Sequence, residues 1–359
     1  MTAWLRRRIP FQCDYPERGV YSPQFFMTSY IRKVALALLF LISVQKLGVA
    51  QREAQLAADQ PSQIHSLKVT ILSTMLADQG IGEWGFSALV EADGHRILVD
   101  TGARPNTVLE NARELHVKLS DVEEVVLTHF HADHVGGLLT LRRALQKENP
   151  AAISRVHVAQ GIFYSRPQKD ASESNPMIAI RREFEAAGGH FIQHDHAAEI
   201  FPGVWLTGPV PRQFPERNWS VSAGSLGVET PQGLREDNVP DDQSLVVNTN
   251  KGLVVITGCG HAGIINILTD AEDQYRKAPV HAVFGGLHLF AATDEQVNWT
   301  ADKMKNLGVA YLVGAHCTGI ESVYRLRGRL GLTRATAVVG AVGASFVLGE
   351  GIHPGAIAQ

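Results

Sequence analysis

Four side chains that bind metals stand within seven residues near the middle of the chain. The segment Thr128-His129-Phe130-His131-Ala132-Asp133-His134 holds three imidazoles and one carboxylate. Imidazole nitrogen and carboxylate oxygen both ligate zinc, and imidazole also suits iron. The apolar, β-branched run Val125–Leu127 precedes the segment and is typical of a buried strand. The pattern predicts a metal centre at the carboxyl end of that strand. The alternative is a histidine-rich surface loop.

The spacing within this segment indicates two adjacent metal ions. His129 and His131 are two residues apart and can point the same way, whereas Asp133 and His134 fall where a helix can begin, at Val135-Gly136-Gly137. Two divalent ions are therefore the expected cofactors: zinc, or else iron or manganese. An ion with an open coordination position lowers the pKa of bound water to about 7 and so supplies a hydroxide nucleophile.

Further ligands are expected later in the chain, because four side chains cannot complete a site for two ions. Three apolar runs each lead to a histidine with a nearby glycine, which allows close approach of the backbone. The runs are Leu253–Thr257 before Cys259 and His261, Val280–Phe284 before His288, and Val309–Val313 before His316.

The motif His129–His134 resembles the signature of the metallo-β-lactamase superfamily. Ile97–Gly102 resembles the upstream strand of that family, which ends in an Asp, here Asp100. Three later segments are similar to one branch of it, the metal-dependent hydrolases that resemble dihydropterin ribofuranosylaminobenzene 5'-phosphate synthase: Gly258–His261, Gly285–Leu289 and His316–Gly319. The resemblance covers most of Leu67 to Leu348.

The resemblance implies a role for each candidate residue. One ion would be held by His129, His131 and His261, and the second by Asp133, His134 and His316. Cys259 stands near the position where relatives place a bridging or second-metal ligand. His288 would be a ligand or a proton-transfer residue, and Asp100 would orient a ligand. The expected catalytic residues are Asp133, Asp100 and His288.

Simpler interpretations remain open for four of these residues. Asp100 could serve simply as the cap of a turn. His261 could contact the N-terminus of a helix expected over Ala262–Tyr275. His288 could be a hydrogen-bonded core residue, and Cys259 a small buried filler.

Another histidine group lies outside these motifs. His190, His194 and His196 include a His-Asp-His sequence that superficially resembles a ligand pair. Because no glycine-flanked strand end accompanies them, we expect a solvated loop or a strand edge.

The order of the elements predicts an α/β fold with mixed sheets, since hairpins occur together with βα units. The family resemblance implies an αββα sandwich, in which two mixed sheets are flanked by helices. Expected strands are Leu67–Ser73, Phe86–Ala92, Arg96–Asp100, Val125–Leu127, Ser244–Asn248 and Leu253–Thr257. Expected helices are Pro105–His116, Leu138–Gln146 and Met177–Ala187.

The first fifty residues are expected to lie outside the folded domain. Met27–Lys33 is basic, Val34–Val44 is apolar and Gly48–Ala50 is a small-residue cleavage site, which together predict a secretory signal peptide. We expect a leader over 1–26 that is disordered or follows from a mistaken start, a signal peptide over 27–50, a linker over 51–65, the domain over 66–350 and a tail over 351–359. Export to the periplasm or medium follows, with no stable membrane insertion after cleavage.

Composition favours a small-molecule substrate. With 33 basic and 36 acidic residues the formal charge is only -3, which gives no field for nucleic acid. Of the cysteines, Cys13, Cys259 and Cys317, the last two adjoin candidate ligands, and no disulfide framework is evident. The polar stretches Ser165–Asn175 and Pro211–Asp242 are expected to form the substrate mouth. The sequence gives no indication of oligomeric state.

These features together predict a metal-dependent hydrolase that acts on an ester, phosphoester, lactone or amide. A Gly-x-Ser-x-Gly nucleophile motif does not occur in the sequence, which argues against a serine hydrolase. Two alternatives remain: a transferase of the dihydropterin ribofuranosylaminobenzene phosphate synthase type, and a non-catalytic, metal-loaded binding protein. Export argues against the transferase, since a step of cofactor synthesis belongs in the cytoplasm.

Overall fold

The computed structural model describes residues 61–219 and 224–358, together with Gly19. The chain divides into two units at Pro61, and all further description concerns the second unit, Pro61–Gln359. The expected leader, the signal peptide and residues 51–60 of the expected linker lie outside the described residues. Among the residues that are described, none of the helices combines the length and the apolar character needed to cross a bilayer.

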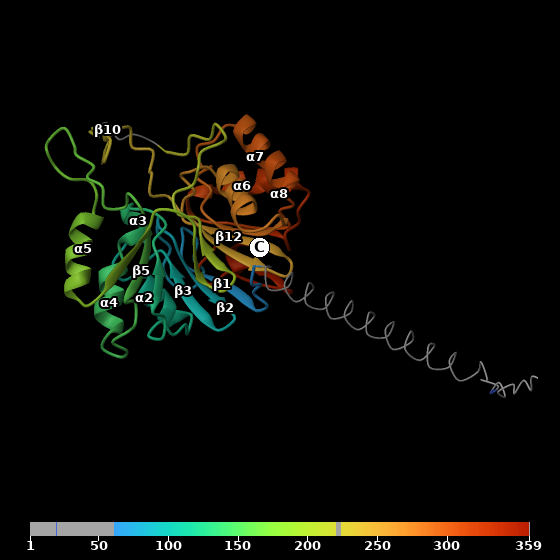
Figure 1. Ribbon diagram of the computed structural model, residues 1–359, viewed down its shortest axis with the longest axis horizontal. Helices are drawn as coiled ribbons and strands as arrows, with labels where there is room; N and C mark the ends of the chain where they lie inside the picture. Colours follow the sequence, from blue (N-terminus) through green and yellow to red (C-terminus); the bar gives the residue numbers. More distant parts are fainter. Residues whose placement is uncertain (1–18, 20–60, 220–223, 359) are drawn as a thin grey trace, which may run out of the picture. The chain divides into compact units, whose positions relative to one another are not determined.

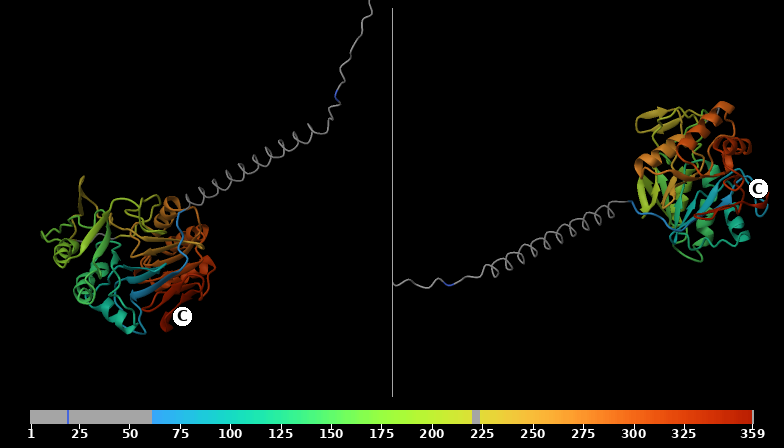
Figure 2. Two further views of the ribbon diagram at one scale, coloured as in Figure 1. Left: turned by 60° about the horizontal axis from the view of Figure 1, so that its bottom comes forward. Right: turned by 90° about the vertical axis from the view of Figure 1, so that its right-hand side faces the viewer.

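An eight-stranded mixed sheet is formed mostly by the first half of the unit. Strands β3 to β6, at one side of the sheet, run parallel, whereas β1, β2, β16 and β17 pair antiparallel. In spatial order the strands are β17 (Gly351–His353), β16 (Ser345–Val347), β1 (Leu67–Ser73), β2 (Ser87–Ala92), β3 (His95–Val99), β4 (Glu124–Val126), β5 (Arg155–Ala159) and β6 (His190–His194). Figure 2 shows the first strands, in blue, beside the last strands, in red, as the pairing of β1 with β16 requires.

A seven-stranded sheet is built mainly from the second half. Strands β12 to β15 are parallel, and β11, β8 and β7 extend the sheet with antiparallel pairing. In spatial order the strands are β15 (Ala337–Val339), β14 (Tyr311–Gly314), β13 (Val280–Gly285), β12 (Gly252–Thr257), β11 (Leu245–Thr249), β8 (Val204–Leu206) and β7 (Ala198–Phe201). A separate hairpin joins β9 (Val228–Thr230) to β10 (Gly233–Arg235).

Helices cover the outer face of each sheet (Figure 1). One group is α2 (Thr107–Glu114), α3 (Ala132–Val135), α4 (Leu138–Leu145) and α5 (Met177–Ala186); the other is α6 (Ile264–Gln274), α7 (Asp294–Asn306) and α8 (Ile320–Leu330). Two short 3₁₀ turns, η1 (His316–Thr318) and η2 (Ala356–Ala358), complete the described elements.

Three hydrophobic clusters correspond to the three interfaces between four layers. Alternate residues of each strand point to opposite faces, so Ile97 and Val99 of β3 pack between the sheets while Leu98 packs under α2 and α4. In the second sheet Ile256 packs between the sheets and Val255 packs beneath α6. The αββα sandwich expected from the family resemblance is confirmed.

The structure corrects several boundaries. The helix expected from Val135 begins three residues earlier, at Ala132, and the helix expected from Ala262 begins at Ile264. The expected tail is not separate, because β17 pairs with β16 and adds a strand after residue 350. At the other end of the domain, Ile64 already forms a bridge to Thr249.

Candidate metal centre

The candidate ligands meet because parallel strands of both sheets end at one edge of the sandwich. The chain leaves β4 into the His129–His134 motif, β12 into Cys259 and His261, and β14 into His316. The neighbouring strands in each sheet are parallel, so their carboxyl ends lie side by side, which is where open α/β sheets bind ligands.

The first group of donors comprises His129, His131 and His261. Nε2 of His129 lies 3.0 Å from Nδ1 of His131. The His261 ring centroid is 4.7 Å from that of His129 and 4.9 Å from that of His131. The three imidazoles predicted to hold one ion are therefore brought together.

The second group comprises Asp133, His134 and His316. Oδ2 of Asp133 is 3.2 Å from Nε2 of His316 and 3.9 Å from Nε2 of His134. The rings of His134 and His316 have centroids 5.0 Å apart. These side chains come from two different sheets, which explains why the second group is complete only in the folded chain.

Cys259 stands between the two groups. Its buried thiol lies 3.1 Å from Nε2 of His134. Its sulfur lies within 4.8 Å of donor atoms of His129 and His261, and equally of His134 and His316. This position fits the predicted bridging or second-metal ligand better than a filler among apolar side chains.

Asp100 positions the second group from beneath. Its carboxylate accepts hydrogen bonds from the backbone N–H and the hydroxyl of Thr128, both at 2.7 Å, and lies 2.7 Å from Nδ1 of His134. Burial opposes a charge on His134, but the carboxylates of Asp100 and Asp133 raise the pKa of His134 to about 9. A carboxylate on the outer nitrogen of a metal-binding imidazole orients the ring and makes it a stronger ligand. These contacts to His134 and Thr128 go beyond a turn cap.

The chemistry of the donors fits divalent metal ions. Burial lowers the pKa of His129 and His261 well below the usual value, and that of His131 to about 3, so these rings are uncharged and keep free lone pairs. Although burial raises the pKa of Asp133, its neighbours His134 and His316 hold that pKa below its usual value.

Several of these donor atoms have no hydrogen-bond partner. Nε2 of His261 and both ring nitrogens of His316 are buried and unpaired, the 3.2 Å contact of His316 with Asp133 lying outside hydrogen-bond geometry. An unpaired buried polar atom is costly in free energy. A bound metal ion would accept these lone pairs and so compensate for the missing hydrogen bonds, which apolar neighbours cannot do.

Strained backbone also occurs at these strand ends. Asp100, His288 and His316 all have positive φ, at 55°, 50° and 46°. Residues other than glycine adopt this left-handed conformation rarely, and it persists where the surrounding structure imposes it, often at functional sites.

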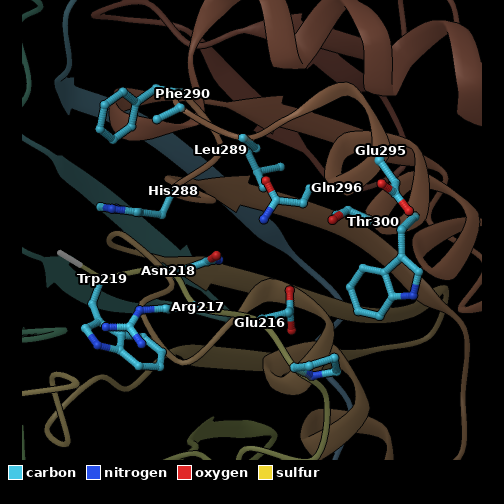
Figure 3. A pocket seen from close by; sticks show the side chains of 14 residues that line it. Glu216, Arg217, Asn218, Trp219, His288, Leu289, Phe290, Glu295, Gln296 and Thr300 are labelled. Atoms are coloured by element: carbon cyan, nitrogen blue, oxygen red, sulfur yellow. The ribbon is translucent and has the colours of Figure 1, made fainter. Parts of the chain in front are cut away.

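A pocket of about 420 Å³ opens beside the centre. Its walls are formed by Pro215–Trp219, by His288–Ala292 and by Glu295, Gln296, Trp299 and Thr300 of α7. Figure 3 shows His288 and Trp219 at one end of this space. The backbone carbonyl of Asn218 in the same wall contacts Nδ1 of His261 at 2.5 Å, so the pocket adjoins the first donor group. This contact, rather than the N-terminus of α6, engages the His261 ring.

The prediction for the substrate mouth is only partly right. Pro211–Asp242 supplies Pro215–Trp219, but it also contains the hairpin of β9 and β10 and is not structureless. Ser165–Asn175 is absent from the walls of this pocket. It folds on itself through Glu173, which accepts hydrogen bonds from Ser165 and Asn175.

The remaining histidine group lies at a strand edge, as predicted. His190 and His194 belong to β6, the outermost strand of the larger sheet. His194 contacts His157 at 2.9 Å, and the other nitrogen of His157 contacts Glu124 at 3.0 Å. None of these histidines belongs to the groups of described residues that could hold a metal ion.

Two adjacent aspartates that the sequence motifs did not single out support both ligand loops. Asp241 accepts a hydrogen bond from the backbone N–H of Phe130 at 2.8 Å, and Asp242 from that of Ala262 at 2.9 Å. Arg166 pairs with Asp241 at 2.5 Å. The only signal in the sequence is an acidic pair directly before a strand, which is ordinary turn chemistry.

Comparisons with known proteins agree with this geometry. The chain is 27% identical over 269 residues to 7,8-dihydropterin-6-methyl-4-(β-D-ribofuranosyl)-aminobenzene-5'-phosphate synthase of Methanocaldococcus jannaschii, which covers 72% of this chain and 90% of that protein. An uncharacterised protein of the same organism is 29% identical over 247 residues, 67% of this chain and 86% of that protein. A solved metal-dependent hydrolase of the β-lactamase superfamily has a TM-score of 0.60 and 28% identity, covering 78% of this chain and 98% of that chain.

The family model described as the metallo-beta-lactamase superfamily matches residues 85–316. This range begins just before β2 and ends at His316, so it contains all the donors described above. With two mixed sheets between helices and a donor cluster at their carboxyl edge, the chain belongs to the metallo-β-lactamase superfamily.

Proposed function

We propose that this protein is a metal-dependent hydrolase that cleaves an ester, phosphoester, lactone or amide bond of a small molecule. The observation that carries the proposal is the juxtaposition of two groups of buried and half-buried donor side chains with an accessible pocket. Pockets of this size suit small organic ligands. A structural metal site would instead be enclosed on all sides.

Residues of the chain would position the metal ions for the reaction. His129, His131 and His261 would hold one ion, and Asp133, His134 and His316 a second, with Cys259 between them. Bound there, divalent ions would polarise the scissile bond and acidify water. Asp100 holds the His134 ring in place through the 2.7 Å contact. Asp133 keeps a negative charge near His316 and thereby favours cation binding.

The pocket would bind the organic part of the substrate. Trp219 and Phe290 offer aromatic surface, and Asn218 and Gln296 offer hydrogen-bonding groups. Because Asn218 also contacts His261, a ligand in the pocket lies next to the first donor group.

Metal content and hydrolysis, measured together, test the proposal. The full chain is loaded with Zn²⁺, and bound metal is counted for the native protein and for His131→Ala and His316→Ala. Each variant should lose about one ion per chain and at least 100-fold of the hydrolytic rate, since the loss of even an outer partner of a metal ligand costs about 10–100-fold. His190→Ala, at the exposed edge of the sheet, is the matched control and should change neither quantity.

A native protein that binds no metal would contradict the proposal. Bound metal without turnover on a broad panel of ester, phosphodiester, lactone and amide substrates would favour the metal-loaded binding protein instead.

One observation favours a second candidate, a transferase. The synthase of Methanocaldococcus jannaschii aligns with this chain over 90% of its own length. The name of that synthase describes a pterin joined to an aminobenzene riboside phosphate. Formation of a product from that pair of compounds, with no hydrolysis of the panel, would establish this reaction in place of hydrolysis.

We also propose export of the protein, on the basis of the signal-peptide pattern in residues 27–50. Mass spectrometry of the protein from a periplasmic fraction should show a mature N-terminus near Gln51. A purified chain that retains Met1 would contradict export by cleavage.

A further inference from the structure

A third group of donor atoms adjoins the two already described. The sulfur atoms of Cys259 and Cys317 and a ring nitrogen of His288 all lie within 4.8 Å of one another. Both cysteines are free thiols and are buried, with 3% and 1% of their surface exposed. Two thiols and one imidazole form a set that binds zinc and softer ions and that magnesium and calcium avoid.

The backbone around this group is arranged to let the thiols meet. A Cβ atom at Gly286 would lie 2.8 Å from the sulfur of Cys317 and 3.2 Å from the Cα of Cys259. The first distance is shorter than Cβ contacts allow and the second is tighter than most, so glycine suits this position. A side chain at position 286 would press against the sulfur of Cys317.

His288 is held towards the cysteines by the adjacent segment. The backbone N–H of Leu287 donates to the Thr318 hydroxyl at 3.0 Å, and that hydroxyl donates to the carbonyl of Gly285 at 3.1 Å. These bonds tie the loop after β13 to η1, which carries Cys317. His288 keeps its strained φ of 50° in this arrangement.

The donor atoms of this group mainly face one another. Nδ1 of His288 is buried without a hydrogen bond. The thiol of Cys317 donates a long hydrogen bond, 3.8 Å, to the carbonyl of Cys259, and it also contacts the side chains of Cys259 and His288. Cysteines that serve as fillers pack against apolar side chains, whereas Cys259 lies against His134 at 3.1 Å.

We propose that Cys259, Cys317 and His288 bind a zinc-like divalent ion of their own, beside the histidine and aspartate cluster. Binding converts both thiols to thiolates and releases their two protons to solvent, as metal binding to cysteine requires. Cys259 is also close to the neighbouring donor groups, so its thiolate connects the new site to the main centre. His288 is also a wall of the pocket, so the ion lies next to the space for a small molecule.

Cadmium is a suitable probe, because thiolate ligation gives Cd²⁺ an ultraviolet charge-transfer absorption that histidine and carboxylate ligation do not. The full chain is stripped of metal under reducing conditions and titrated with Cd²⁺ alone. The native protein should show the absorption of two thiolates, and Cys317→Ser about half of it. His190→Ala, at the exposed edge of the larger sheet, is the matched control and should keep the full intensity.

Equal absorption of the native protein and Cys317→Ser would overturn the proposal, because Cys259 alone would then be the sulfur ligand. If Cys317→Ser does not fold, X-ray absorption of the native, zinc-loaded protein decides. Two sulfur ligands per chain at about 2.3 Å from zinc support the site, and one or none overturns it. Neither measurement depends on hydrolysis, so the result is separate from that of the proposed function.

Discussion

Asp100 makes the densest set of contacts to the metal centre of any residue that is not expected to touch a metal ion. It bonds Thr128 twice and His134 once. Asp100→Asn keeps the shape but removes the charge, and its amide can present a donor where His134 needs an acceptor. We predict a loss of about 10–100-fold in affinity for the second ion. Competition with a chromophoric chelator measures this affinity.

Asp302→Asn provides the comparison for this change. Asp302 pairs with Arg329 on the surface of α7, so the same chemical substitution should leave metal affinity unaltered. Equal affinities of Asp100→Asn and the native chain would show that Asp100 only supports the turn.

At the residue scale, the sequence predicts the donors that form local motifs. His129, His131, Asp133 and His134 are recognisable because their spacing in the chain is itself the chemical signal. The carbonyl of Asn218 and the thiol of Cys317 are distant from this motif in the sequence and approach the site only in the folded chain. A backbone carbonyl has no residue type to reveal it, and a buried cysteine resembles a filler until its neighbours are known.

At the element scale, the close approach of β12 to the ends of β3 and β4 depends on Gly258. A Cβ there would lie 2.0 Å from the Thr128 hydroxyl and 2.5 Å from a carboxylate oxygen of Asp100. Gly258→Ala should therefore separate the two sheets at the metal centre and destabilise the fold by about 1–3 kcal/mol. Urea denaturation and metal counting on the same sample test both effects.

Gly328→Ala is the matched control for this substitution. Gly328 lies in α8, and a Cβ there would meet nothing within 4 Å. Alanine should raise stability by about 0.5–1 kcal/mol, as in other helix interiors, and leave the metal content unchanged. If Gly258→Ala behaved in the same way, the close packing of the strand ends would not be required.

Glu216 links the pocket wall to the start of α6. Its carboxylate accepts hydrogen bonds from the backbone N–H groups of Ile265 and Asn266, at 3.2 and 2.9 Å. Burial nevertheless raises the pKa of Glu216 to about 7, from 4.5. Between pH 4.5 and about pH 7 the carboxyl group of Glu216 keeps its proton in the folded chain and has lost it in the unfolded chain. The free energy of unfolding therefore falls as the pH rises through this range.

Glu216→Gln removes that dependence. Relative to the native protein, its unfolding free energy should rise by about 1–2 kcal/mol between about pH 5 and about pH 8, allowing for the partial exposure of Glu216. Denaturation curves at the two pH values give this difference. Glu295→Gln, at an exposed position on the rim of the same pocket, should show no such change. If the difference in unfolding free energy between Glu216→Gln and the native protein did not change with pH, the hydrogen bonds from α6 would offset the effect of burial on the pKa of Glu216.

Element types could be predicted from the sequence better than element ends. The strand Leu67–Ser73 is confirmed to the residue, and all of its residues except Lys68 are buried. The helix expected from Ala262 begins two residues later, since Gly263 adopts a φ of 97° that no helix allows. Such local conformations depend on tertiary contacts, here with Glu216, rather than on hydrophobic periodicity.

For the whole molecule, metal binding should contribute to folding stability. The donors come from both sheets, so the unfolded chain cannot reproduce the site. Free Zn²⁺ at a hundred times its dissociation constant would stabilise the fold by about 2.7 kcal/mol. We therefore predict that a chelator lowers the midpoint of thermal unfolding by several degrees, and that Zn²⁺ restores it. Differential scanning calorimetry measures the midpoint, which should not respond to Mg²⁺. An unchanged midpoint after complete metal removal would contradict this linkage.

The layer architecture could be expected only from the family resemblance. Composition and periodicity predict mixed α/β structure, but the division of strands between two sheets depends on long-range pairing such as β1 with β16. The sequence does not predict the hairpin of β9 and β10, because the few apolar residues of Pro211–Asp242 are scattered and form no alternating run of strand length. Its strands are short, and four of their residues are exposed, namely Glu229, Gly233, Leu234 and Arg235.

The left-handed conformation of His288 sets stability against ligand binding at that position. Holding a residue other than glycine in this region costs about 1–3 kcal/mol, whereas the additional entropy that glycine loses on folding is about 0.5–1 kcal/mol. Glycine would therefore be favoured at position 288 if only thermal stability were selected. A library selected for heat resistance should enrich glycine there, and a library selected for metal retention should exclude it. A histidine at a position suited to glycine therefore points to a function of its imidazole.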